Sequence, residues 1–207
     1  MNLPNKLSLL RIILIPFTLL FMLPVSIYGW EPEGWNSFIN NYGMTIAAVI
    51  FIVASLTDFF DGQIARRQNL VTNLGKFLDP LADKVLVISV LLGFLALGRV
   101  NAWCVMLIVF RDFMISGIRL VAAAKGEVMA AKMIGKVKTF VQMVAIIYLL
   151  FEPLLLRIFT GEIHTYPLPV CTVTVIGDVF FYLCVILTVV SGLDYLIKNL
   201  DLFRNSK

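Results

Sequence analysis

The sequence predicts an all-α, polytopic membrane protein with six transmembrane helices, and three observations support this fold class. Hydrophobic residues make up 60% of the 207 residues and charged residues only 14%, which is too apolar for a soluble domain of this length. The apolar residues occur in runs of about twenty, the length at which a helix crosses a bilayer. The basic residues gather in alternate connections between these runs, as expected for a chain that crosses a membrane repeatedly.

The apolar runs define the expected helices in order. We expect transmembrane helices near residues 8–28, 43–64, 77–98, 102–123, 137–156 and 172–197. Before the first, Asn2–Ser8 holds a proline and a possible Asn cap, which predicts a short interfacial helix. The stretch Trp30–Trp35 is expected to be an external connection, and residues 126–138 either a surface turn or an extension of the fifth helix. Since no repeat or linker is visible, residues 1–207 are expected to form a single membrane domain.

The distribution of Lys and Arg predicts the orientation. Six spans put both termini on the same side, and that side receives 13 of the 17 basic residues. The positive-inside rule makes it the cytoplasmic side of the inner cell membrane. Since topology accounts for the net charge of +4 and no nucleic-acid-reading module is present, we expect no nucleic-acid partner.

Four aspartates at the cytoplasmic ends of the second and third spans form the main candidate site. Asp58 and Asp61 are three residues apart, and Asp79 and Asp83 are four apart, so each pair lies on one face of its helix. The short connection between the spans predicts antiparallel neighbours whose four carboxylates converge. One such Asp is more often a cap or an ion-pair partner, but each costs roughly 2.5–3.5 kcal/mol near a bilayer centre. Four together predict a site for hard divalent cations, Mg²⁺, Mn²⁺ or Ca²⁺ rather than zinc, with two ions bridged for phosphoryl displacement.

A divalent-cation transporter is the alternative from a different functional class, since carboxylates within membranes also mark ion paths. That function predicts acidic residues spread across the bilayer depth. Here they concentrate at one side, and the small residues interleaved with them have no role in permeation.

The residues around the aspartates extend the pattern to Asp58-x2-Asp61-Gly62-x2-Ala65-Arg66-x8-Gly75-x3-Asp79-x3-Asp83. All eight positions resemble the signature of the CDP-alcohol phosphatidyltransferase family, and the chain is also similar to that family in size and number of spans. The resemblance implies transfer of a phosphatidyl group from CDP-diacylglycerol to an alcohol, with release of CMP.

The resemblance also implies roles for individual residues. Two divalent cations, Mg²⁺ or Mn²⁺, would be held by the four aspartates, and Asp83 would also take the proton of the acceptor hydroxyl. The CDP-lipid would be bound by Gly62, Ala65, Arg66 and Gly75, with further hydrogen bonds from Asn5, Ser8 and Thr72. Members of the family suggest a homodimer in the lipid bilayer.

Basic residues beyond the signature bear on the acceptor. Arg111 and Arg119 lie on the fourth span, where a charge is costly unless it faces a polar cavity. With Lys132 and Lys136 they predict a pocket for an acceptor phosphate, although Arg111 has the alternative of pairing with Asp112. Lys125 and Lys138 are interpreted as ordinary basic residues of a cytoplasmic connection.

The opening residues Asn2–Arg11 and the Lys132-x3-Lys136 pair are similar to the branch of the family that uses sn-glycerol 3-phosphate and forms phosphatidylglycerophosphate. Inositol phosphate would need a comparable basic pocket, whereas inositol or serine would need it less.

Overall fold

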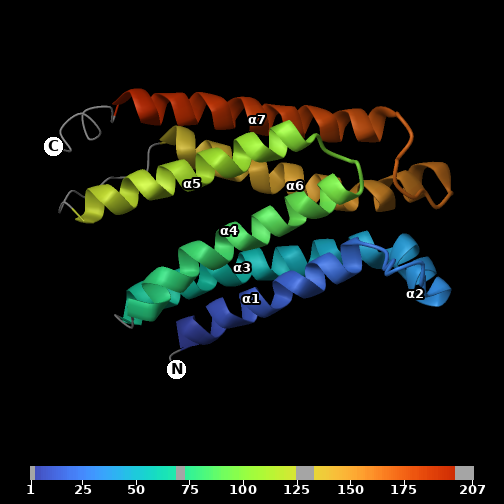
Figure 1. Cartoon of the computed structure of the whole chain (residues 1–207), viewed down its shortest axis with the longest axis horizontal. Helices are drawn as coiled ribbons and strands as arrows, with labels where there is room; N and C mark the ends of the chain where they lie inside the picture. The colour runs from blue at the N-terminus through green and yellow to red at the C-terminus, as the bar shows by residue number, and fades with distance from the viewer. Residues whose placement is uncertain (1–2, 69–72, 125–132, 199–207) are drawn as a thin grey trace.

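The computed structural model is a bundle of long helices that run roughly along one axis (Figure 1). It describes the backbone of residues 3–68, 73–124 and 133–198, and the side chains of residues 9–57, 81–122 and 133–198. The helices are α1 (Leu3–Met22), α2 (Glu33–Phe38), the π-helical turn η1 (Ile39–Gly43), α3 (Met44–Gln68), α4 (Asn73–Ala96), α5 (Ala102–Ala124), α6 (Met133–Thr160) and α7 (Thr172–Lys198). The all-α fold class predicted from the sequence is confirmed for these residues.

The helices alternate in direction, so their ends gather at two opposite ends of the bundle (Figure 1). One end holds the start of α1, the end of α3, the start of α4 and the end of α7. The opposite end holds α2 and the connections from α4 to α5 and from α6 to α7. The bundle is joined by contacts of α1 with α3 and α4, of α3 with α6, of α4 with α5, and of α7 with α5 and α6. The end where α3 meets α4 carries the acidic motif.

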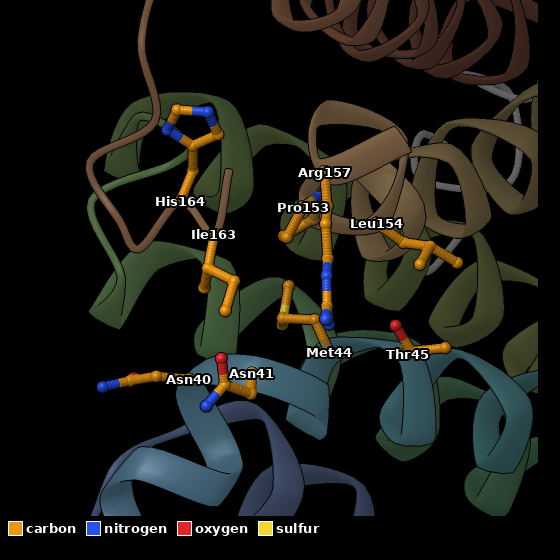
Figure 2. A pocket seen from close by; sticks show the side chains of 9 residues that line it. All are labelled: Asn40, Asn41, Met44, Thr45, Pro153, Leu154, Arg157, Ile163 and His164. Atoms are coloured by element: carbon orange, nitrogen blue, oxygen red, sulfur yellow. The ribbon is translucent and has the colours of Figure 1, made fainter. Parts of the chain in front are cut away.

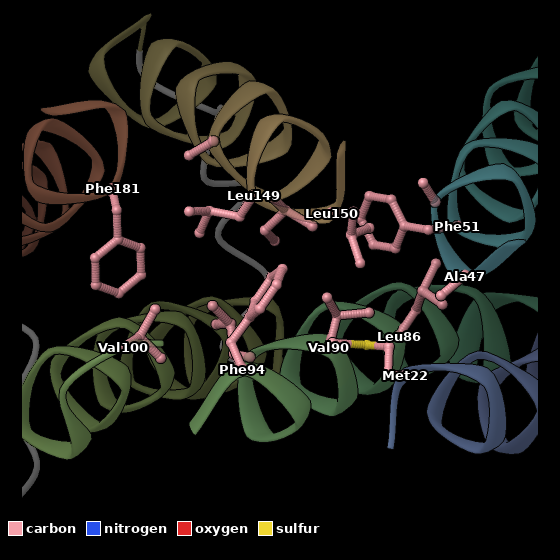
Figure 3. Packing of buried hydrophobic residues seen from close by; sticks show 14 of the residues in the cluster. Met22, Ala47, Phe51, Leu86, Val90, Phe94, Val100, Leu149, Leu150 and Phe181 are labelled. Carbon is pink, nitrogen blue, oxygen red and sulfur yellow. The ribbon is translucent and has the colours of Figure 1, made fainter. Parts of the chain in front are cut away.

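The apolar core lies between α3, α4 and α6 and reaches α1 and α7. Phe51 and Phe94 are fully buried there together with Leu149 and Leu150 of α6 (Figure 3). Small side chains, Ala47 among them, allow α3 to approach its neighbours closely. In a bilayer, such close contact stabilises helix association through dispersion, since lipid tails are as apolar as the side chains.

The first helix differs from the expectation at both ends. α1 begins at Leu3 and continues without interruption, so the described residues hold no separate short helix before the first span. It ends at Met22 rather than near residue 28. Pro24 explains this early end, because proline disfavours helical backbone in the residue before it and has no N–H to donate. The Asn36 amide then bonds both the N–H and the carbonyl of Val25, at 2.8 and 2.9 Å, which folds the chain back.

The second helical stretch starts earlier than predicted. The connection expected at Trp30–Trp35 becomes helical at Glu33. Glu33 is favourable in the first turn because its negative charge is attracted to the partial positive charge of the helix N-terminus. α2, η1 and α3 then follow one another without a break. Residues 126–138 were expected to form either a surface turn or an extension of the fifth helix. Because α6 begins at Met133, residues 133–138 extend that helix, while residues 125–132 lie outside the described part of the chain.

Within the described residues, three helical stretches are long and apolar enough to cross a membrane: Glu33–Thr57, Met133–Thr160 and Thr172–Lys198. α5 has 23 residues but carries Arg111, Asp112 and Arg119 along its length. Large apolar side chains such as Trp103, Phe110 and Ile186 are exposed on the outer faces of the bundle. This combination is typical of a helical membrane protein.

Candidate functional site

The helices α3 and α4 carry the four aspartates to the same end of the bundle. Asp58 and Asp61 belong to the last three turns of α3, and Asp79 and Asp83 to the first three turns of α4. The backbone therefore has the antiparallel arrangement that the sequence predicted. Of the four side chains, only that of Asp83 is described, and among the described side chains no group of three or more acidic, His or Cys residues forms a metal cluster.

Other predicted site residues also fall where side chains are not described. This applies to Asn5 and Ser8 in α1, to Gly62, Ala65 and Arg66 in α3, and to Gly75 in α4, whose backbones are helical. Thr72 and Lys132 lie outside the described residues altogether. The assignment of CDP-lipid contacts to these residues remains a prediction.

Asp83 lines an open cavity of about 760 Å³ whose walls are formed by α4, α5 and α6. That volume is within the range of small-molecule sites. The lining residues farther from the Asp83 end of α4, such as Leu91 and Ile108, are apolar, whereas those near Asp83 are polar. Lys84 follows Asp83 on α4, donates a hydrogen bond to Ser116 of α5 and lies 5.6 Å from the centre of the Phe113 ring. A carboxylate and several cations therefore share one cavity.

Three of the four residues predicted to bind an acceptor phosphate line this cavity: Arg111, Arg119 and Lys136. Arg119 is exposed, and its guanidinium carbon lies 5.9 Å from the centre of the Tyr195 ring. Lys136 is also exposed. The fold therefore brings these three residues of α5 and α6, which are separated by up to 25 positions, to one cavity, while their role in binding phosphate stays a prediction.

Arg111 is both a cavity residue and an ion-pair partner, so the two alternatives considered for it are compatible. Its Nη1 lies 2.8 Å from Asp112 Oδ1, and its Nε donates to Ser191 Oγ of α7 at 2.9 Å. A Cβ at Gly192 would lie 3.2 Å from Arg111 Cγ, so a residue without a side chain leaves room for Arg111 against α7.

Lys138 is the residue that sequence reasoning misjudged. It is 1% exposed, and its Nζ donates to both carboxylate oxygens of Asp112, at 2.7 and 2.8 Å, and to Gln142 Oε1 at 2.7 Å. The interpretation of Lys138 as an ordinary connection residue is therefore wrong, because α6 has already begun at Met133 and turns this side chain inward. The sequence signal that could have indicated a buried Lys138 is Gln142, a second polar residue one turn further along an otherwise apolar helix.

A second ionic cluster, with Glu152 buried at its centre, lies at the opposite end of the bundle. Arg99 donates to both carboxylate oxygens of Glu152, at 2.7 and 2.8 Å, and to Asp178 at 2.6 Å and the Thr174 carbonyl at 3.1 Å. The hydrogen bonds that Arg99 donates to these carboxylates, chiefly those to Glu152, raise the pKa of Arg99 above its usual value. The cluster joins the α4–α5 connection to α6 through Glu152 and to α7 through Asp178.

A smaller hollow near that end is formed by η1, α3 and α6 (Figure 2). Arg157 extends across it toward Met44 and Thr45, while His164 lies on the far side above Asn40. His164 Nε2 lies 3.0 Å from Thr160 Oγ1. The nine residues that line this hollow all belong to the described part of the chain, and none of them carries a carboxylate. The hollow therefore lacks the donor set of a hard-metal site.

The metal interpretation fits the described geometry. Asp83 is half-buried beside a polar cavity, and the helical backbones place three further Asp at the same end of the adjoining helices. Carboxylate oxygens are the ligands preferred by Mg²⁺ and Mn²⁺, and two ions would offset the like charge of such a group.

Comparisons with known proteins show what the whole chain is similar to. A family model described as CDP-alcohol phosphatidyltransferase matches residues 1–190. The chain is 41% identical over 205 residues to the CDP-diacylglycerol–glycerol-3-phosphate 3-phosphatidyltransferase of Bacillus subtilis (strain 168), covering 99% of this chain and 98% of that protein. Proteins with the same name from Shigella flexneri serotype 5b and Rickettsia felis are 38% and 33% identical, covering 94% of this chain and 93% of each protein.

The similarity covers nearly the whole chain in each of these relatives, and the matched region includes the aspartate motif, the cavity and the basic residues around it. The chain belongs to the CDP-alcohol phosphatidyltransferase family.

Proposed function

We propose that this protein transfers the phosphatidyl group of CDP-diacylglycerol to sn-glycerol 3-phosphate, producing phosphatidylglycerophosphate and CMP. The relatives that match it over nearly their full length carry the name of this activity. The structural observation that carries the proposal is the cavity in which Asp83 shares walls with Arg111, Arg119 and Lys136. A proton acceptor and a set of cations in one cavity suit an alcohol that bears a phosphate.

The acidic residues at the ends of α3 and α4 would hold two divalent cations, Mg²⁺ or Mn²⁺. Asp58, Asp61 and Asp79 serve as ligands, and Asp83 completes the second site. When bound, the ions supply charge stabilisation for the diphosphate and for departing CMP. Asp83 also accepts the proton of the acceptor hydroxyl. The hydroxyl oxygen then forms a bond to the lipid-bearing phosphorus, while the bond from that phosphorus to the CMP oxygen breaks.

The small residues of the motif are assigned to the nucleotide end of the lipid substrate. Gly62, Ala65 and Gly75 leave the helix backbones accessible to a bulky diphosphate, and Arg66 supplies a cation for it. Asn5, Ser8 and Thr72 are proposed to add hydrogen bonds.

The phosphate of the acceptor is assigned to the basic residues of α5 and α6. Arg111 and Arg119 offer planar donor groups that match phosphate oxygens, and Lys136, with Lys132 before it, adds point charge. This division gives the acceptor a place beside Asp83 that is separate from the lipid diphosphate.

The proposed setting is the cytoplasmic membrane. α1, α4 and α5 lie alongside the three strongly apolar stretches and are proposed to complete six spans. Both termini and the acidic end of the bundle are assigned to the cytoplasm because basic residues concentrate there. The exposed apolar faces are proposed to contact lipid and, in a homodimer, a second copy.

The test is CMP release from CDP-diacylglycerol by the purified protein, with glycerol 3-phosphate, inositol phosphate, inositol and serine compared, with and without Mg²⁺ or Mn²⁺. We expect release with glycerol 3-phosphate only in the presence of a divalent cation. CMP release with serine or inositol, but not with glycerol 3-phosphate, would overturn the assignment of glycerol 3-phosphate as the acceptor. No release with any acceptor would overturn the enzymatic function.

A further inference from the structure

The cavity wall contains a largely buried charge network of which the proposed function uses only Arg111. It consists of Arg111, Asp112, Lys138 and Gln142, contributed by α5 and α6. Lys138 is its least exposed member, and its three ammonium protons are matched by three acceptors: both oxygens of Asp112 and Oε1 of Gln142. A lysine buried this completely is costly unless its charge is paired and its donors are all bonded, as they are here.

The charges of the network leave one positive charge for the cavity. Arg111 and Asp112 alone would neutralise each other, and the Asp112 carboxylate would repel an incoming phosphate. Because Lys138 binds both oxygens of Asp112, the three groups together carry a net charge of +1. Arg111 uses Nε and Nη1 for Ser191 and Asp112, and its Nη2 lies 3.6 Å from the position of a Cβ at Gly135, another residue of the cavity wall.

Gln142 supplies an independent observation. Its Oε1 accepts from Lys138, which fixes the orientation of the amide and makes Nε2 the group that remains available to donate. Gln142 is 4% exposed and lines the cavity, and Nε2 has no hydrogen-bond partner among the described residues. A buried donor without a partner costs about 1–3 kcal/mol, and a ligand oxygen in the cavity would remove that cost.

We infer that Lys138 is a positioning residue for an acceptor subsite in which Gln142 Nε2 donates to an oxygen of glycerol 3-phosphate beside Arg111. Lys138 acts through both partners: it orients the Gln142 amide, and it neutralises Asp112 so that the charge of Arg111 is available to the phosphate. The inference rests on the proposed function, because it assigns further residues to the same acceptor site.

Two single variants test the two arms of the inference. Gln142→Glu keeps an oxygen for Lys138 but replaces the donor by a second carboxylate oxygen, and Lys138→Gln leaves the charge of Asp112 uncompensated. Each is expected to raise the KM for glycerol 3-phosphate roughly tenfold or more, since each adds unbalanced negative charge within a few ångströms of the phosphate. The KM for CDP-diacylglycerol should change little.

A charge-neutral pair and a conservative variant separate positioning from a merely structural role. Asp112→Asn combined with Lys138→Gln removes both charges and leaves the +1 of Arg111, so the acceptor KM should return to within about threefold of the wild type. Lys138→Arg should restore part of the acceptor affinity relative to Lys138→Gln. Lys198→Gln, which alters an exposed pair on α7, serves as the control and should leave the acceptor KM unchanged.

Binding is measured as well as turnover. Titration of glycerol 3-phosphate into the metal-free protein, in chelator and without CDP-lipid, should show weaker binding for both single variants, with glycerol as the probe that lacks a phosphate. An unchanged acceptor KM and unchanged binding in folded Gln142→Glu would overturn the inference while leaving the transferase function standing. Wild-type protein that fails to use glycerol 3-phosphate would overturn the proposed function itself.

Discussion

Asp83 stands at the junction of two groups of residues with different tasks. On the chain it belongs to the motif that also includes Asp58, Asp61 and Asp79, and in space it borders the cavity with Lys84 and the basic residues of α5. A carboxylate in this position can bind a cation with one oxygen and take a proton with the other. A substitution of Asp83 is therefore expected to distinguish binding of the CDP-lipid from the proton transfer that accompanies turnover.

Asp83→Asn preserves the shape of the side chain but cannot accept the hydroxyl proton. We expect turnover to fall by at least about a hundredfold, the usual range for loss of a general base, while binding of the CDP-lipid largely survives. CMP release and CDP-lipid-dependent thermal stabilisation of the same preparation measure the two effects. Turnover close to that of the wild type would remove Asp83 as the base.

Arg119→Ala removes an exposed cation from the cavity wall. Because solvent screens this side chain more than Arg111, we expect a moderate rise in the acceptor KM, about three- to tenfold, with little change in kcat. Initial rates at varied glycerol 3-phosphate provide the measurement. An unaltered acceptor KM would argue against its part in phosphate binding.

Asp83 and Lys138 differ in how far the sequence alone can predict their positions. The aspartate spacing could predict a role for Asp83 because all four acids lie within one short stretch of chain. Lys138 could not be identified in the same way, since its partner Asp112 lies 26 positions earlier on another helix. Whether such a lysine faces lipid, water or a carboxylate depends on helix rotation, which the sequence pattern near a helix start does not determine.

At the scale of the elements, α3, α4, α5, α6 and α7 agree with their predicted positions to within four residues at each end. The agreement is best for α5 and α7, which are bounded by polar or turn-forming residues next to a long apolar run. The prediction failed around residues 22–33, where Pro24 ends α1 while Glu33 starts α2. An apolar run that continues beyond a helix end gives no hydropathy signal of that end.

Packing between elements depends on Gly177 as well as on charges. A Cβ at Gly177 would collide with Glu152 Oε1, so this position on α7 admits only a residue that leaves room for the carboxylate. Glu152 is fully buried, and Arg99 is its bidentate partner. The close approach of α6 and α7 at this end therefore requires both the small residue and the ion pair.

Glu152→Gln tests the ion pair without changing the size of the side chain. Loss of a buried charge partner should destabilise the protein by about 3 kcal/mol and lower the Tm. Specific activity at low temperature should persist, because the cluster lies at the end of the bundle opposite the acidic motif. Thermal unfolding in detergent with Lys198→Gln as the control makes the comparison. An unchanged Tm would contradict the stabilising role of this pair.

On the scale of the whole molecule, the arrangement of helix ends makes a prediction about topology. The α6–α7 connection and the end of α7 lie at opposite ends of the bundle (Figure 1). In a background in which Cys171 is replaced by Ser, Glu162→Cys should react with a membrane-impermeant thiol reagent in intact cells. Lys198→Cys should react only after permeabilisation, because the end of the bundle that is rich in basic residues is proposed to face the cytoplasm. The reverse pattern would invert the proposed orientation.

The two charge networks described above tie α6 near both of its ends. Lys138 binds α5 at one end, and Glu152 binds Arg99 next to α7 at the other, 14 residues further along the same helix. Sliding or turning α6 would break an ion pair of low exposure at each end, so we expect α5, α6 and α7 to keep their relative positions when the bundle binds its substrates.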